Sequence, residues 1–196
     1  MTLTDDQRDG LNRALNEATW LGLTVDADAG RVTTTFDVLT LPEVGPSPEH
    51  ALATLVLDGV SRVAASLRNG MWYDRTASVE TLQLAQLPET VDRVSGHPIY
   101  GCEFVDPPER SWASWRDRLS LDVNLAEPPG RHVLDLFQEA GRILQHLDLR
   151  IWFDSLRVTD PDGGEIPLQD FIDGGVRWWD ALFARDPRTQ GRGIVA

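Results

Sequence analysis

The stretch WLGLTVDADAGRVTTTFDV, residues 20–38, carries the clearest pattern for the fold. Apolar residues alternate along it on both sides of the turn-forming segment 26–30: Leu21, Leu23 and Val25 before the turn, Val32, Phe36 and Val38 after it. A period of two places successive side chains on opposite faces of a strand. Two such runs around a turn predict a β-hairpin.

Similar alternation outside this hairpin predicts further strands at residues 51–57, 79–87, 99–105, 118–125 and 149–153. Residues 60–67 fit a helix or a strand. We favour a strand, because the turn-forming pair Asp58-Gly59 joins the segment directly to the strand before it. Turn residues 160–164 close a second hairpin onto Glu165 and Ile166.

Two helices are expected near the ends of the chain. Thr4 and Gln7 match a capping box, which predicts a short helix over residues 5–18. A longer amphipathic helix begins at Pro167 and ends at Asp186-Pro187. Its apolar stripe consists of Leu168, Phe171, Ile172, Val176, Trp179, Leu182 and Phe183. We expect Phe171, Trp179 and Phe183 to be buried against the sheet, and Trp178 to lie at the edge of the stripe.

Residues 131–146 fit two structures equally well. Their apolar residues recur at helical spacing, whereas the turn-forming segment 127–130 favours a hairpin. A helix would align five polar residues on one face, which we interpret as a solvated face rather than a metal site: His132, Asp135, Glu139, Arg142 and His146.

These elements predict an α+β fold, mainly antiparallel β-sheet built from hairpins, with a short N-terminal helix and a longer amphipathic C-terminal helix. A chain of 196 residues fits one domain. We expect residues 1–187 to form this single globular domain and residues 188–196 to form a flexible C-terminal tail.

All 18 cationic side chains are arginines, and the chain has no lysine. Arginine codons are mostly rich in G and C, so the composition points to a high-GC bacterium. The absence of lysine excludes Schiff-base enzymes, P-loop NTPases, protein kinases and serine β-lactamases, because each of these uses a lysine.

The net charge of −13 argues against nucleic acid and anionic membranes as partners, because both require a cationic surface. Residues 1–6 lack a signal-peptide pattern, and no run of 18 apolar residues occurs. We therefore expect a soluble, cytoplasmic protein.

Motifs for cofactor, metal or nucleophilic sites are missing, so we expect no cofactor, no metal and no catalytic residue. The two D-x-D-x-G turns lack the glycine and the glutamate of a calcium-binding loop. Cys102, the one cysteine, is followed by Glu103, whose charge disfavours a reactive thiolate, so we interpret it as a buried structural residue.

One polar segment, residues 106–116, combines tryptophans with arginines, the two residue types that dominate binding hot spots. Arg110, Trp112, Trp115 and Arg116 are therefore the candidate binding residues, although large rings are more often buried and we favour a core-covering role for one or both tryptophans. The pairs Trp72-Tyr73 and Trp178-Trp179 pose the same choice.

Composition and the lack of catalytic motifs favour a non-enzymatic, protein-binding domain, similar in kind to an immunity or inhibitor protein, with a basic protein as partner. The alternative is a small-molecule-binding protein or a carboxylate-dependent hydrolase whose site is assembled from scattered residues. A concave pocket with converging carboxylates favours the alternative, and an exposed aromatic patch favours protein binding.

Overall fold

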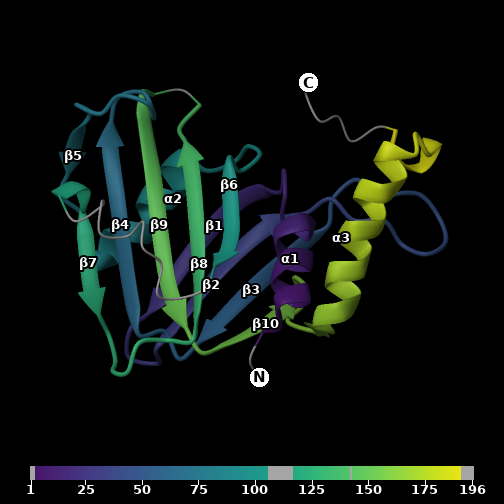
Figure 1. Cartoon of the computed structure of the whole chain (residues 1–196), viewed down its shortest axis with the longest axis horizontal. Coiled ribbons are helices and arrows are strands. Elements are labelled where there is room, and N and C mark those ends of the chain that lie inside the picture. Colours follow the sequence, from purple (N-terminus) through teal and green to yellow (C-terminus); the bar gives the residue numbers. More distant parts are fainter. Residues whose placement is uncertain (1–2, 106–116, 142, 191–196) are drawn as a thin grey trace.

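The computed structural model describes residues 3–105, 117–141 and 143–190, which form two antiparallel sheets and three α-helices (Figure 1). The first sheet has the order β1 (Thr19–Asp26), β2 (Arg31–Asp37), β3 (Leu52–Asp58), β10 (Ser155–Thr159) and β11 (Glu165–Ile166). The second has the order β5 (Ser78–Glu80), β4 (Arg62–Asn69), β9 (Gln145–Phe153), β8 (His132–Glu139) and β6 (Gly101–Val105), and β7 (Leu121–Asn124) also pairs with β4. The α+β prediction is therefore confirmed.

A ribbon of two chain segments joins the sheets. β3 pairs with β10 in the first sheet, and their continuations β4 and β9 pair in the second. At the crossing, the Asp154 amide donates to the Asp58 carbonyl at 3.0 Å, and the Ser61 amide donates to the Trp152 carbonyl at 2.9 Å. Gly59 has a φ of 66° there, a conformation that glycine adopts readily. The expected strand after Asp58-Gly59 is present, but it lies in the other sheet from β3.

The core lies between the sheets, where the alternate residues of facing strands meet. Trp20 and Phe36 of the predicted hairpin are fully buried, together with Leu134 and Phe153 of the second sheet. The Trp20 indole donates to Thr34 Oγ1 at 2.8 Å, so its one polar group is satisfied. The predicted hairpin is present and forms one wall of the core, but a bulge between Trp20 and Gly22 places Trp20 rather than Leu21 in that wall.

Helix α2 (Leu87–Val94) is an element that the sequence pattern missed. We expected a strand over residues 79–87, but β5 covers only Ser78–Glu80, and a 3-10 turn (Leu84–Gln86) leads into the helix. Pro88 lies in the first turn of α2, where a proline costs no hydrogen bond. Leu87, Val91 and Val94 are buried at helical spacing, and α2 packs against β1 and β9.

Helix α1 (Asp5–Ala14) begins with the predicted capping box. Thr4 Oγ1 accepts from the Gln7 amide at 3.2 Å, and the Gln7 side chain accepts from the Thr4 amide at 3.0 Å. The helix ends at Ala14 rather than at residue 18, because the chain turns at Glu17, where φ is 59°.

Helix α3 (Leu168–Phe183) begins after Pro167 as predicted, but it packs on α1 and on the connector between β2 and β3 (residues 38–51) rather than on a sheet face (Figure 1). Phe171 and Trp179 are buried as expected. One expectation was wrong, because Phe183 is 75% exposed. Trp178, which was expected at the edge of the apolar stripe, is 0% exposed. Trp178, Trp179 and Leu41 form a small separate core, and this core shifts the buried face of the helix away from Phe183.

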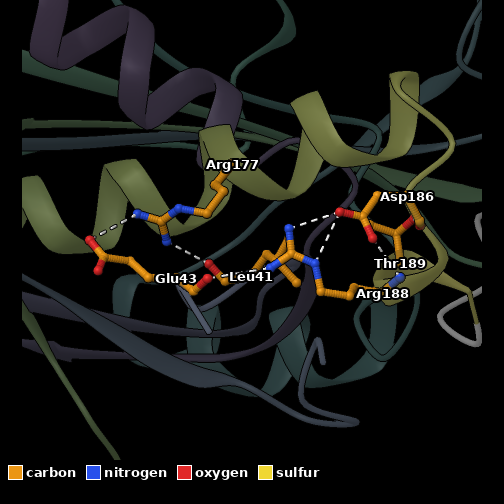
Figure 2. A network of polar contacts seen from close by, with 6 residues as sticks. All are labelled: Leu41, Glu43, Arg177, Asp186, Arg188 and Thr189. Atoms are coloured by element: carbon orange, nitrogen blue, oxygen red, sulfur yellow. Dashed lines mark hydrogen bonds and ion pairs between the residues drawn. The ribbon is translucent and has the colours of Figure 1, made fainter. Parts of the chain in front are cut away.

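Polar contacts hold the connector to α3 and to the 3-10 turn η3 (Pro187–Thr189) (Figure 2). Arg177 donates to the Leu41 carbonyl at 2.7 Å and lies 4.0 Å from the Glu43 carboxylate. Arg188 donates to Asp186 at 2.8 Å and to the Glu43 carbonyl at 3.4 Å. Residues 188–190 of the expected tail take part in this turn, and residues 191–196 lie outside the described residues.

Residues 131–146 adopt the extended alternative: β8, a short turn and the start of β9. The polar face that a helix would have formed is therefore absent. His132 lies on the core side of β8, where its Nε2 accepts from the Leu3 amide, while Asp135 lies on the opposite side. Within the described ranges, no helix is long and apolar enough to cross a membrane.

Candidate functional site

The outer face of the second sheet, turned away from the first sheet, carries charged residues in register. One cross-strand row contains Glu103 of β6, Asp135 of β8, Arg150 of β9 and Ala64 of β4. The next row contains Gly101, Phe137, Asp148 and Ser66. Directly opposed residues on one face have Cβ atoms about 5 Å apart, so these side chains contact one another across the strands.

Two arginines of this face are buried and ion-paired. Arg150 is 7% exposed and forms a bidentate pair with Asp135 through its Nε and a terminal nitrogen. Arg68 is 6% exposed and pairs with Asp148. The guanidinium of Arg150 also lies 5.8 Å from the ring centre of Trp152, within cation–π range. Replacing a buried ion pair by apolar residues is often neutral or stabilising, so stability is a weak reason for these pairs.

A cleft of about 230 Å³ lies over these rows. Its described lining includes three carboxylates, one guanidinium and one hydroxyl: Glu103, Asp135, Asp148, Arg150 and Ser66. Leu119, Phe137 and Ala64 supply apolar wall. Ser66 is fully buried at the floor, and its Oγ has no hydrogen-bond partner among the described residues. An unsatisfied buried hydroxyl costs about 1–3 kcal/mol, so its position calls for an explanation.

Burial also shifts the titration of two groups on β9. It raises the pKa of Asp148 to about 6, against the opposing effect of Arg68. Burial and the nearby charge of Arg68 lower the pKa of His146. The Nδ1 of His146 lies 3.0 Å from the Gly70 carbonyl and must donate to it, which places the ring proton on Nδ1 in the neutral form.

The other histidines make separate contacts. His50 Nδ1 lies 2.8 Å from Asp37, and His97 Nε2 lies 2.6 Å from the Glu139 carbonyl. In the part of the chain that the structure describes, no three His, Cys, Asp or Glu side chains are grouped so that they would hold a metal ion. Cys102 is buried, as expected, and burial together with Glu103 and Asp135 raises the pKa of its thiol.

The candidate binding residues Arg110, Trp112, Trp115 and Arg116 lie outside the described residues. The two aromatic pairs Trp178-Trp179 and Trp72-Tyr73 differ in burial. Trp178 and Trp179 are buried, whereas Trp72 and Tyr73 are 56% and 63% exposed in the β4–β5 loop.

An exposed aromatic patch surrounds Trp72 and Tyr73. The β8–β9 turn lies beside their loop, since the Gly70 amide donates to the Leu144 carbonyl at 2.7 Å. Leu144 is 69% exposed, and Met71 is 39% exposed. We call Met71, Trp72, Tyr73 and Leu144 the aromatic patch.

The cleft residues were missed by the sequence reading because they occupy polar positions of alternating strands. In LDLRIW, residues 147–152, Asp148 and Arg150 alternate with apolar residues, which is also the pattern of a solvated strand face. Opposite charges two positions apart were the one available signal, since these side chains share a face.

No known protein family, curated protein or solved structure matches the chain. The geometry of the cleft and of the aromatic patch is therefore the basis for a functional proposal.

Proposed function

We propose that the protein is a small-molecule-binding domain whose ligand occupies the cleft on the outer face of the second sheet. The observation that carries this proposal is the Ser66 hydroxyl, buried at the floor of a charged cleft with no partner among the described residues. A ligand that hydrogen-bonds to this hydroxyl offsets the cost of its burial. Binding sites commonly combine apolar walls with a few polar groups in this way.

The ion pairs support a binding role because they fix the polar groups before a ligand arrives. Two hydrogen bonds from Arg150 orient the Asp135 carboxylate, and one from Arg68 holds Asp148 Oδ2. Groups that are already positioned lose little conformational entropy on binding. The volume of about 230 Å³ lies below the range of roughly 300–1,000 Å³ for drug-sized ligands, so the ligand is small.

A fragment screen followed by two-dimensional NMR tests this proposal. We expect fragments to shift the amide resonances of residues 64–66, 135–137 and 148–150. Ser66→Ala should weaken binding without loss of stability, because no described residue hydrogen-bonds to the hydroxyl. Thr35→Ala, on the outer face of the first sheet, is the matched control and should leave binding unchanged. Shifts confined to other surfaces, or no shifts from any fragment, would refute the proposal.

Protein binding is a second candidate function, and the aromatic patch favours it. Trp72 and Tyr73 each expose more than half of their surface to solvent. A net charge of −13 suits a basic partner. Trp72→Ala should leave the melting temperature unchanged while weakening the capture of a basic protein at low salt. Capture that is equal for the variant and the native protein would rule out the patch as the binding surface.

A further inference from the structure

We infer that the ligand of the cleft is a small organic cation, with an amidinium, guanidinium or ammonium group directed at Asp148 and the Ser66 hydroxyl, while Glu103 contributes negative charge from the β6 side of the cleft. This inference rests on the proposed function and names its ligand class. Four independent properties of the described residues support it: charge, hydrogen-bonding capacity, the apolar walls and the volume.

The described residues that line the cleft carry more negative than positive charge. Three carboxylates and one guanidinium occur among the described lining residues. Arg68 adds a cation through its pair with Asp148, and Arg118 lies near Asp148 outside the described lining. Asp135 is matched by Arg150, and Asp148 by Arg68, whereas no described residue pairs with Glu103. An anionic ligand would be repelled by Glu103, whereas a cation would be attracted to it.

The free hydrogen-bonding positions are mainly acceptors. Asp148 accepts from Arg68 through Oδ2, and its Oδ1 receives no hydrogen bond from a described residue. The Glu103 carboxylate is exposed, and the Ser66 hydroxyl can accept as well as donate. A ligand that presents N–H donors to Asp148 Oδ1 and to the Ser66 hydroxyl satisfies both groups, and its hydrogen bond to the Asp148 carboxylate is charge-assisted.

The walls and the volume favour an organic cation over an inorganic one. Leu119 and Phe137 offer apolar surface to a hydrocarbon body, and the Phe137 ring can also attract a cation. A bare metal ion would need several ligands that converge on one point, and the described residues show no such group.

The test compares three probes of nearly equal size and shape: benzamidine, benzamide and benzoate. We expect benzamidine to shift the cleft amides with an affinity at least about tenfold higher than that of the neutral or the anionic probe. Benzamide or benzoate binding in the cleft as tightly as benzamidine would overturn the inference and leave the proposed function standing. No cleft shift from benzamidine would also overturn the inference, and no cleft shift from any fragment would overturn both.

Two variants separate a local contact from the general negative charge. Glu103→Gln should lower benzamidine affinity by about three- to tenfold and leave benzamide unaffected, because it removes one charge at an exposed position. Glu139→Gln is the matched control, on the same outer face but outside the described cleft lining. Equal losses in both variants would attribute the preference to net charge and overturn the assignment to the cleft.

The pH dependence supplies a separate readout. Asp148 is faced by Arg68 from β4, Asp135 from β8, Arg118 before β7 and His146 on its own strand. Acidification from pH 7.5 to 5 protonates Asp148, whose pKa is about 6. It also adds positive charge at His146, at a pH below the ordinary pKa of histidine because the pKa of this ring is lowered. Benzamidine stays cationic throughout, so its affinity should fall. Asp148→Asn should remove the part of this fall centred near pH 6, and an unchanged profile in this variant would overturn the inference.

Discussion

The contact between α1 and α3 gives a prediction in which two physical effects have opposite signs. Gly175 lies inside α3, where replacement by alanine normally stabilises a helix by about 1 kcal/mol. Here a Cβ at position 175 would lie 2.5 Å from the Ala14 Cβ and 2.6 Å from the Ala14 Cα. Ordinary van der Waals contact begins near 3.4 Å, so α1 must move away by about 1 Å.

We expect the steric effect to exceed the helix-propensity effect. Overpacking of a well-packed contact costs about 1–3 kcal/mol, and the atoms that must move here include helix backbone. Moving α1 also disturbs Leu11, which is fully buried at the same helix. Gly175→Ala should therefore lower the free energy of unfolding by about 1 kcal/mol and the melting temperature by about 2–4 °C.

Urea unfolding of purified variants measures this effect. Asp173→Ala is the control, because it makes a similar change at an exposed position of the same helix and should stay within about 0.5 kcal/mol of the native protein. Ala14→Gly in the Gly175→Ala background should recover part of the loss, since it removes the 2.5 Å contact. A Gly175→Ala protein as stable as the native one, or more stable, would refute the close packing of α1 on α3.

Three further predictions concern buried side chains. In urea unfolding, Trp178→Ala should lower the free energy of unfolding by about 3–5 kcal/mol, because this ring is fully buried. Phe183→Ala should lower it by less than about 0.5 kcal/mol, because this ring is exposed. Equal losses in the two variants would contradict the observed buried face of α3. The folded-state pKa of Asp148, about 6, exceeds the unfolded value of about 3.9, so its contribution to stability is full below pH 4 and is lost as pH rises through 6. The free energy of unfolding of the native protein, measured relative to that of Asp148→Asn, should thus fall by about 3 kcal/mol between pH 4 and 7. A relative free energy that rises over this range would show that the Asp148 carboxylate is not desolvated. The Cys102 thiol should react with a disulfide reagent only after unfolding, and rapid labelling of the folded protein would contradict its burial.

Local sequence signals predicted the elements that local physics determines. The hairpin at residues 20–38, the capping box at Thr4 and the helix start at Pro167 depend on residues within a few positions of each other, and all three are present. Residues 131–146 stayed ambiguous because their apolar pattern fits both periods. Pairing with β6 and β9, which are distant or later in the chain, decides in favour of a strand.

The candidate site was harder to predict, because neighbouring strands from distant parts of the chain create it. Glu103, Asp135 and Asp148 belong to three strands, and no spacing within one of them marks a cleft. The prediction of the buried face of α3 was wrong for the same reason, because Leu41 of the connector, rather than a sheet, covers Trp178. Hydrophobic spacing indicates that a face is buried, but it does not identify the partner.

The ribbon that joins the two sheets has a consequence for how the chain folds. Asp58 pairs with Ser155 and Ser66 pairs with Asp148, so the central strands of both sheets pair with partners roughly 80 to 100 positions away. The entropy of closing these long loops must be lost before the pairings become favourable. Proteins dominated by such non-local pairing fold in milliseconds to seconds, more slowly than helical bundles. On a ribosome, β3 remains without its partner β10, and β4 without its partner β9, until most of the chain has been made.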